Sequence, residues 1–386
     1  MEEKNNIYKK FQSFENFKNI NQLNTDEIEQ KIFNIYKEFK MKLPKTFNEK
    51  DKILLEKIIT DLKSKNKNEN AFSLKPNSIA EINTFKNLDT LKYLISRYKY
   101  EIYPKTKELD VYPPLIQIEP SSICNFRCVF CFETDKTFTN KKNGFMGTMN
   151  FELYKKIVDE IEGKVQFVTL ASRGEPLVAK SFSKMLEYAS EKFLVLKINT
   201  NASLLNQDKC HAILSSGVKT VVFSADAADE KLYSKLRVNG DLKKTLQNIK
   251  MFKNIKDTNY KNSKIITRVS GVKFNDEQKF SEMENLWGEL VDQVAFVDYN
   301  PWENCYEKEK NNIKEACSDL WRRMFIWWDG KINPCDVDYK SHLSPGKYPE
   351  ISIKDSWNSD LYNKLRKAHL NKNREGLIPC KACSVI

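Results

Sequence analysis

Apolar positions along this chain follow two different periods, and the change between them divides the sequence. Between residues 25 and 105, apolar side chains recur at three- and four-residue steps, which is the spacing of amphipathic helices. Ile28, Ile32 and Ile35 begin this series. We therefore expect this part of the chain to be all-helical. The same helical pattern returns at residues 53–62 and 79–94, with a polar loop at residues 63–70 between them.

After a proline-containing linker at residues 103–114, short apolar runs alternate with amphipathic segments, which is typical of a parallel α/β fold. The predicted strands are Leu115–Glu119, Val165–Leu170, Leu194–Asn199, Thr220–Ser224, Ile265–Val269 and Gln293–Val297. The predicted helices between them are Phe151–Ile161, Phe182–Lys192, Gln207–Ser215, Leu242–Ile255 and Glu277–Leu290. Six β/α units are too few for a closed eight-stranded barrel, so the pattern predicts a partial (β/α)6 barrel.

From residue 301 the chain becomes irregular, rich in tryptophan and cysteine, which indicates a small appendage held together by metal. We therefore divide the chain into three parts. They are a helical extension at 1–110, a barrel at 111–300 and a small metal-binding domain at 301–386.

The composition of the chain limits its protein class and its cellular compartment. Its 386 residues are 40% hydrophobic, enough for a full-sized core. The formal net charge is +12, but lysines are scattered rather than massed on one helix, so nucleic-acid binding is not favoured. No export signal or apolar stretch of about 18 residues is present, which predicts a cytoplasmic protein without a membrane partner. In a reducing compartment, clustered cysteines indicate metal ligands or catalytic thiols rather than disulfides.

The segment Cys124-Asn-Phe-Arg-Cys128-Val-Phe-Cys131 directly follows the first predicted strand, where barrel folds place their chemistry. Iron–sulfur clusters are normally held by four cysteines, so a compact set of three implies an iron with an open position. A zinc site completed by a distant ligand is the alternative. The histidines are His211, His342 and His369, and none lies near this loop.

This loop resembles the CxxxCxxC motif of the radical S-adenosylmethionine (SAM) superfamily, including the aromatic Phe130 before its last cysteine. The resemblance covers residues 115–386 and implies that Cys124, Cys128 and Cys131 hold a SAM-cleaving 4Fe–4S cluster. It also implies that SAM chelates the open iron with Phe130 near its adenine. Reductive cleavage of SAM would then give a 5'-deoxyadenosyl radical that abstracts hydrogen from a substrate.

Further SAM contacts follow from the same resemblance. The turn Ser172-Arg-Gly174-Glu175-Pro is similar to the superfamily's Gly-Gly-Glu-Pro, with an arginine for the first glycine, and implies that Gly174 and Glu175 contact the methionyl amine. Asn199 resembles a ribose contact, although helix capping by its neighbours explains the polar cluster equally. Ser224, in a Ser-x-Asp like that of the family, and Arg237 complete the predicted set, with a solvated helix arginine as the alternative for Arg237.

A second cysteine set consists of Cys317, Cys335, Cys380 and Cys383, and four thiolates suit either an iron–sulfur cluster or a structural zinc. The surrounding sequence looks like the SPASM/twitch domain that follows many radical SAM barrels, which favours an auxiliary 4Fe–4S cluster that transfers an electron. Cys305 follows the last predicted strand. It is an alternate ligand, a catalytic hydrogen donor or a buried loop thiol.

Together these features predict a radical SAM enzyme, an oxidoreductase or modifying enzyme with two 4Fe–4S clusters and SAM. A flavodoxin- or ferredoxin-like protein would supply the electron. The all-helical N-terminal segment favours a small sugar-like or nucleoside-like substrate over a peptide, as in the maturation of ribosomal peptides. A non-catalytic iron–sulfur electron carrier and a zinc-stapled nucleic-acid binder are the hypotheses from other classes.

Overall fold

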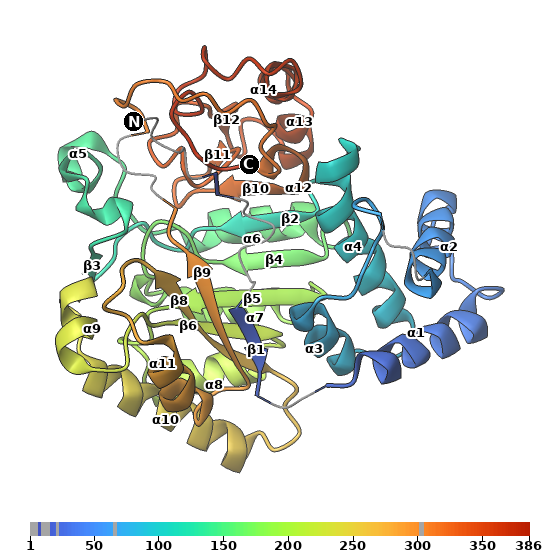
Figure 1. Cartoon of the computed structure of the whole chain (residues 1–386), viewed down its shortest axis with the longest axis horizontal. Coiled ribbons are helices and arrows are strands. Elements are labelled where there is room, and N and C mark those ends of the chain that lie inside the picture. The colour runs from blue at the N-terminus through green and yellow to red at the C-terminus, as the bar shows by residue number, and fades with distance from the viewer. Residues whose placement is uncertain (1–6, 9–15, 21–22, 65–67, 301–304) are drawn as a thin grey trace.

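A computed structural model describes residues 7–8, 16–20, 23–64, 68–300 and 305–386 of the chain. At its centre lies a ten-stranded sheet in the order β1-β9-β8-β6-β5-β4-β2-β10-β11-β12 (Figure 1). Six neighbouring strands run parallel and form the partial barrel. They are β2 (Leu115–Ile118), β4 (Phe167–Leu170), β5 (Val195–Thr200), β6 (Thr220–Ser224), β8 (Ile266–Lys273) and β9 (Gln293–Asp298). These are the six strands predicted from the sequence.

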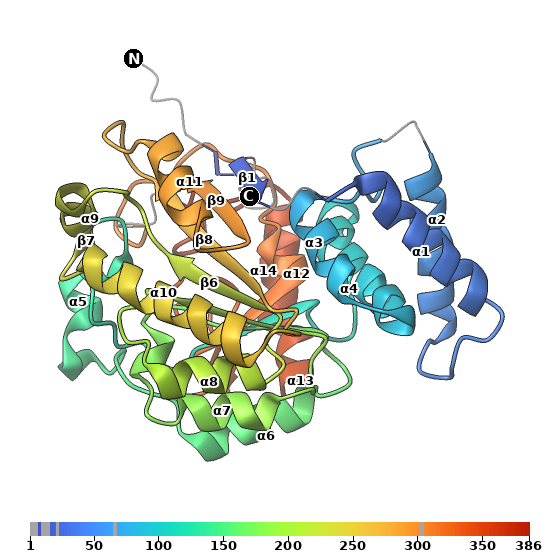
Figure 2. The ribbon, with the colours of Figure 1, turned by 90° about the horizontal axis from the view of Figure 1, so that it is seen from below.

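Helices cover one face of this parallel sheet, as expected for β/α crossovers (Figure 2). Alternate strand residues such as Ile116, Val168 and Ile198 share one hydrophobic core with those helices, because successive strand side chains point to opposite faces. Their partners along the strands, including Gln117 and Asn199, line the other face. The covering helices are α6 (Phe151–Ile161), α7 (Phe182–Ala189), α8 (Gln207–Ser215), α10 (Leu242–Asn259) and α11 (Phe280–Gly288).

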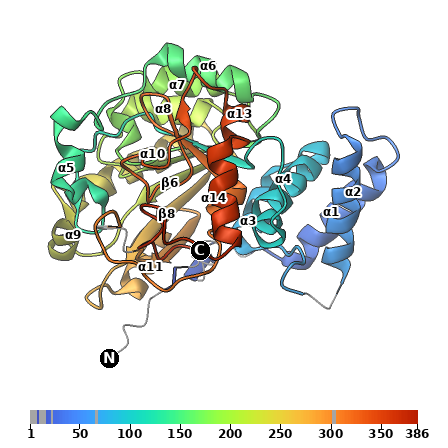
Figure 3. The ribbon, with the colours of Figure 1, turned by 90° about the horizontal axis from the view of Figure 1, so that it is seen from above.

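The N-terminal segment forms a second hydrophobic core against the start of the barrel strands, which it reaches through Phe167 and Val195. Its helices are α1 (Thr25–Phe39), α2 (Glu49–Lys63), α3 (Pro76–Thr84) and α4 (Asn87–Thr106). In Figure 3, α3 and α4 lie next to the barrel and α1 and α2 lie farther out. The predicted run at 79–94 is therefore two helices, and α4 continues through Pro104 into the expected linker.

The expectation of an all-helical N-terminal segment is wrong at one point. Strand β1 (Asn16–Asn19) pairs antiparallel with β9, so that Phe17 lies opposite Ala295. Four residues without an apolar alternation are too short a signal to predict a strand; the pairing comes from the free edge that β9 offers.

The C-terminal part is more regular than its sequence suggested. Strand β10 (Arg323–Ile326) pairs in parallel with β2 and extends the barrel sheet, and β11 (Lys331–Asn333) and β12 (Gly346–Lys347) follow it. The helices here are α12 (Asp319–Arg322), α13 (Ile353–Trp357) and α14 (Asp360–Leu370). Further short elements are β3 (Arg127–Cys128), β7 (Arg237–Val238), α5 (Lys136–Thr139) and α9 (Glu230–Leu236). Among the described helices, none is long and apolar enough to cross a membrane.

Candidate functional site

A cavity of about 710 Å³ lies on the face of the sheet that the outer helices leave uncovered. Nine of the residues singled out in the sequence line it, although they come from five separate segments of the chain. They are Cys124, Cys128, Phe130, Cys131, Gly174, Glu175, Asn199, Ser224 and Arg237. The fold therefore brings the three cysteines of the first loop and the predicted SAM contacts to one place.

The cysteine loop is fastened to the barrel by its own backbone. Strand β3 pairs with β7, and Val129 N donates to Leu236 O over 3.0 Å. Burial raises the pKa of Cys124 to about 12 and that of Cys128 to about 11, and both burial and Cys128 raise the pKa of Cys131. Thiolates in such a place need a cation, so the three sulfurs suit an iron–sulfur cluster.

Gly174 lies directly beneath the cysteine loop. A Cβ atom at this position would be 2.5 Å from Ser122 C and 2.6 Å from Ser121 O. Glu175 N donates to Ile123 O over 3.0 Å, so this turn and the start of the loop are in backbone contact. The glycine of this motif is therefore required by close packing.

The carboxylate of Glu175 is hydrogen-bonded within the protein. It accepts hydrogen bonds from Thr200 Oγ1 at 2.6 Å, Asn201 N at 2.7 Å and Leu177 N at 3.1 Å. Burial raises its pKa despite these donors. In this structure the side chain ties the ends of β4 and β5 together and also lines the cavity, and its contact with SAM stays a prediction.

Asn199 and Ser172 line the cavity, and each carries a polar atom without a hydrogen-bond partner in the described part of the chain. Asn199 Oδ1 and Ser172 Oγ are both buried without a hydrogen bond. Buried polar atoms are almost always satisfied, so an unpartnered pair at a cavity wall fits a polar ligand. Asn201, two residues beyond Asn199, contacts the cysteine loop, since its Nδ2 lies 3.0 Å from Asn125 Oδ1 and 4.0 Å from Cys124 Sγ.

Arg237, one of the predicted SAM contacts, is paired with an acid. Its Nε forms a 2.5 Å ion pair with the buried Asp226, while Nη1 points toward Cys128 Sγ at 3.9 Å. The guanidinium also lies 6.0 Å from the Phe130 ring centre. Arg237 therefore faces the cysteine loop with one edge only, and the alternative of a solvated helix arginine is wrong.

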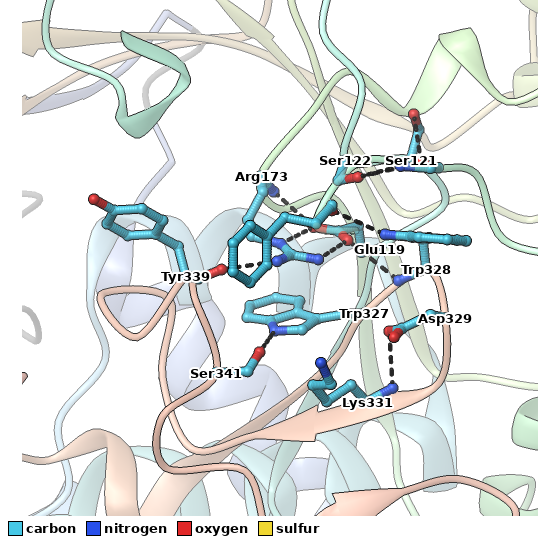
Figure 4. A network of polar contacts seen from close by, with 12 residues as sticks. Glu119, Ser121, Ser122, Arg173, Trp327, Trp328, Asp329, Lys331, Tyr339 and Ser341 are labelled. Carbon is cyan, nitrogen blue, oxygen red and sulfur yellow. Dashed lines mark hydrogen bonds and ion pairs between the residues drawn. The ribbon is translucent and has the colours of Figure 1, made fainter. Parts of the chain in front are cut away.

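Arg173 replaces the first glycine of the expected motif, and the structure gives its side chain a buried site of its own (Figure 4). The guanidinium donates to both carboxylate oxygens of Glu119, at 2.6 and 2.8 Å, and to Tyr339 O at 2.8 Å. It also stacks 4.2 Å from the centre of the Trp327 ring. Since Tyr339 and Trp327 belong to the C-terminal part, Arg173 joins that part to the barrel.

The second cysteine set also lies around one space. A small cavity of about 20 Å³ is lined by Cys317, Cys335, Cys380 and Cys383. Burial raises the pKa of Cys317 to about 11 and raises those of Cys335 and Cys380 further. Four thiols in one apolar space are a full donor set for a cluster. In the described residues, no three His, Cys, Asp or Glu side chains are grouped to hold a single metal ion.

Comparison with known protein families shows which family the chain belongs to. Residues 118–281 match the profile of the radical SAM superfamily, and residues 317–384 match the SPASM iron–sulfur cluster-binding domain. This chain belongs to the radical SAM superfamily. It therefore binds 4Fe–4S clusters and SAM, and it is an enzyme. The interpretations as a zinc protein and as a non-catalytic electron carrier are wrong.

The relatives of this radical SAM enzyme act in different reactions. It is 24% identical to a protein of Pyrococcus furiosus described as a "tungsten-containing aldehyde ferredoxin oxidoreductase cofactor-modifying protein", over 70% of this chain and 87% of that one. It is 27% identical to the GTP 3',8-cyclase of Campylobacter lari, over 48% of this chain and 55% of that one. It is also 23% identical to the mycofactocin maturase of Mycolicibacterium smegmatis, over 40% of this chain and 38% of that one.

Among solved structures, the radical SAM enzyme resembles SuiB of Streptococcus suis bound to SAM. The TM-score is 0.54 at 18% sequence identity, covering 89% of this chain and 84% of SuiB. At this level of identity, the likeness concerns the fold alone.

Cys305 lies with the second cysteine set rather than with the first. It is fully buried in a cluster with Cys317 and Cys383, and a hydrogen bond with Cys383 raises its pKa. It is not among the described residues that line the large cavity. This position does not favour the predicted role as a hydrogen donor, and it leaves the interpretations as an alternate ligand and as a buried thiol.

Two residues near the second set of this radical SAM enzyme escaped the sequence analysis. His369 Nδ1 accepts from Cys317 N at 3.1 Å, and burial lowers the pKa of His369 to about 3. Arg374 donates to the carbonyls of Cys383 and Val385. The spacing of His369 from Tyr362 and Leu365 puts all three on one helix face, and this was the available signal.

Proposed function

We propose that this enzyme cleaves SAM reductively and uses the 5'-deoxyadenosyl radical to abstract hydrogen from a small metabolite. The observation that carries the proposal is that one cavity is lined by the three cysteines of the loop, the unpartnered Asn199 and the ends of the barrel strands. Cys124, Cys128 and Cys131 would hold the SAM-cleaving cluster. When bound, that cluster supplies the electron that breaks a carbon–sulfur bond of SAM.

The protein's own groups prepare this site. The Asp226–Arg237 pair presents a positive edge to Cys128, which favours the thiolate form. Phe130 is buried against Phe274, with ring centres 5.7 Å apart, and forms an apolar wall for an adenine. Asn199 Oδ1 offers an acceptor to a ribose hydroxyl.

We assign the auxiliary cluster to Cys317, Cys335, Cys380 and Cys383, with an electron-transfer role. Asp336, the neighbour of Cys335, lines the large cavity. The same cavity therefore runs from the loop of Cys124 to the chain next to an auxiliary ligand, and a substrate radical held between them would be close to both. This arrangement suits an oxidation in which the substrate radical loses an electron.

A small substrate agrees with the N-terminal segment. In the described residues, the helices of this segment pack on the barrel, and β1 is a strand of the barrel sheet. The segment is therefore a structural part of the barrel. Peptide maturation is the second candidate, and the similarity to the mycofactocin maturase supports it. Tight binding of a short precursor peptide would favour this candidate.

The external electron would come from a flavodoxin- or ferredoxin-like protein. Such carriers are acidic, and the net charge of +12 on this chain is complementary to them. A cytoplasmic location agrees with both the carrier and the clustered cysteines.

The decisive experiment is anaerobic reconstitution followed by dithionite and SAM. We expect release of 5'-deoxyadenosine from the wild type, and none when Cys124, Cys128 and Cys131 are replaced by alanine. The matched control is Cys210→Ala, because Cys210 packs inside α8 and the hydrophobic core, away from both cysteine sets. Undiminished release from the triple variant would refute the proposal.

A further inference from the structure

The large cavity has a second end that the chemistry of the cysteine loop does not use. Positively charged side chains from four elements line it: Lys197 of β5, Arg268 of β8, Arg97 of α4 and Arg323 of β10. The sulfur end and this positive end belong to the same space, so a molecule placed between them meets both.

The position of Lys197 separates the two ends. It lies on β5 four residues before Asn201, the residue that approaches Cys124 Sγ to 4.0 Å. At about 3.3 Å per residue, the two Cα atoms are about 13 Å apart. The positive end is therefore too deep to serve a group that is held at the cysteines.

Two of these four cations have an acidic partner, and a third is hydrogen-bonded to an amide. Arg97 pairs with Glu101 at 2.6 Å, and Arg323 pairs with Asp319 at 3.2 Å. Arg268 donates to Gln293 at 2.9 Å. Among the described residues, Lys197 is different, because its ammonium group has neither a hydrogen bond nor an ion pair with any of them. The ammonium group of Lys197 is therefore available to a molecule bound in the cavity.

The surroundings of Lys197 are unfavourable to its charge. Burial, and then the charge of Arg268, lower the pKa of Lys197 to about 7. Arg323 and Arg97 act in the same direction, and Glu81 of α3 opposes them. Glu81 in turn accepts a 2.6 Å hydrogen bond from Tyr93. A positive charge held in a low-dielectric site without a counter-ion is costly, and a bound anion removes that cost.

We propose that Lys197 binds an anionic group, a phosphate or a carboxylate, at the deep end of a small sugar-like or nucleoside-like substrate. Arg268 adds positive potential beside it, and α3 and α4 close this end of the cavity. This gives the N-terminal helices a function, since Arg97 and Glu81 both come from them. The inference rests on the proposed function, because the anchored substrate would lie between Lys197 and the cysteine loop.

The test is calorimetric titration of the SAM-loaded, reconstituted protein with inorganic phosphate and, separately, with acetate. For Lys197→Met we expect the tighter-binding anion to lose affinity by roughly 10- to 150-fold, as when a charge-assisted hydrogen bond is removed. Lys197→Arg should keep most of the affinity. Binding should weaken in the wild type as the pH rises above about 7, because Lys197 then loses its proton more readily.

The matched control is Lys219→Met. Lys219 is a partly buried lysine next to β6 with a lowered pKa, but it lies 4.4 Å from the Phe85 ring centre and does not line the cavity. Its variant should bind the anion like the wild type. The anion that binds more tightly, phosphate or acetate, indicates which anionic group the substrate carries.

Dithionite-driven release of 5'-deoxyadenosine is measured in parallel and separates two kinds of failure. If Lys197→Met releases it normally and binds both anions as the wild type does, the anion site is refuted and the proposed function stands. If the wild type releases none, the proposed function fails. If Lys197→Met does not fold, the rate of acetylation of Lys197 in the wild type is measured by mass spectrometry with and without the anion. We expect the anion to slow this reaction, and an unchanged rate would refute the site.

Discussion

At the scale of single residues, the turn after β4 is built from two unusual neighbours. Gly174 permits backbone contact with the cysteine loop, and Arg173 occupies a position where the family's motif has glycine. The two positions of the motif therefore have different roles. Gly174 allows the close backbone contact, and the side chain of Arg173 is buried and joins the C-terminal part to the barrel.

Gly174→Ala tests the close approach. The added Cβ would overlap the backbone of Ser121 and Ser122, so we expect about 1–3 kcal/mol of lost stability and poor assembly of the first cluster. Iron content and 5'-deoxyadenosine release should both fall. Gly376→Ala is the control, because nothing lies within 4 Å of a Cβ there. A fully loaded and active Gly174→Ala enzyme would contradict the packing argument.

At the scale of elements, the central observation is that β10 continues the barrel sheet. Its residues pair with β2 from Arg323 opposite Leu115 to Ile326 opposite Ile118, and Glu119 N then donates to Ile326 O. The Arg173–Glu119 pair lies directly beyond this ladder, where Trp328 N also donates to Glu119. Backbone pairing and a buried ion pair therefore join the same two elements.

Breaking this pair should be costly. Arg173→Met leaves the Glu119 carboxylate, which has 0% exposure, without its cation, and we expect a loss of about 3–5 kcal/mol in the free energy of unfolding. Arg173→Met combined with Glu119→Gln should cost less than the sum of the two single variants. Denaturant unfolding of all four proteins measures this coupling. Simple additivity would show that the two side chains act independently.

At the scale of the whole molecule, the net charge of +12 bears on electron delivery. We expect reduction of the clusters by a reduced flavodoxin to slow by about tenfold or more between low and high ionic strength, because salt screens the attraction of opposite charges. Stopped-flow absorbance measures the rate. A neutral viologen radical of matched potential is the control and should show little dependence on salt. An unchanged rate with flavodoxin would argue against an acidic partner.

Most of the barrel could be predicted from the sequence, because its strands are short apolar runs between amphipathic segments, and Cys124, Cys128 and Cys131 stand in a spaced motif. The deep end of the cavity could not. Lys197 and Arg268 stand inside predicted strands, and a charge at an inward position of a barrel strand was the available signal. The partners of Glu175 and Arg237 were also hidden, since Thr200 and Asp226 reach them only through the fold.

The parallel pairing of β10 with β2 makes the C-terminal part continuous with the barrel sheet, without a hinge between these two described parts. The loop of Cys124 follows β2 and Cys335 follows β11, and β10 joins these two strands in one sheet, so the distance between the two cysteines is set by the sheet. We therefore do not expect electron transfer to be controlled by a movement of the C-terminal part relative to the barrel. We expect it to depend instead on which molecule is bound in the large cavity.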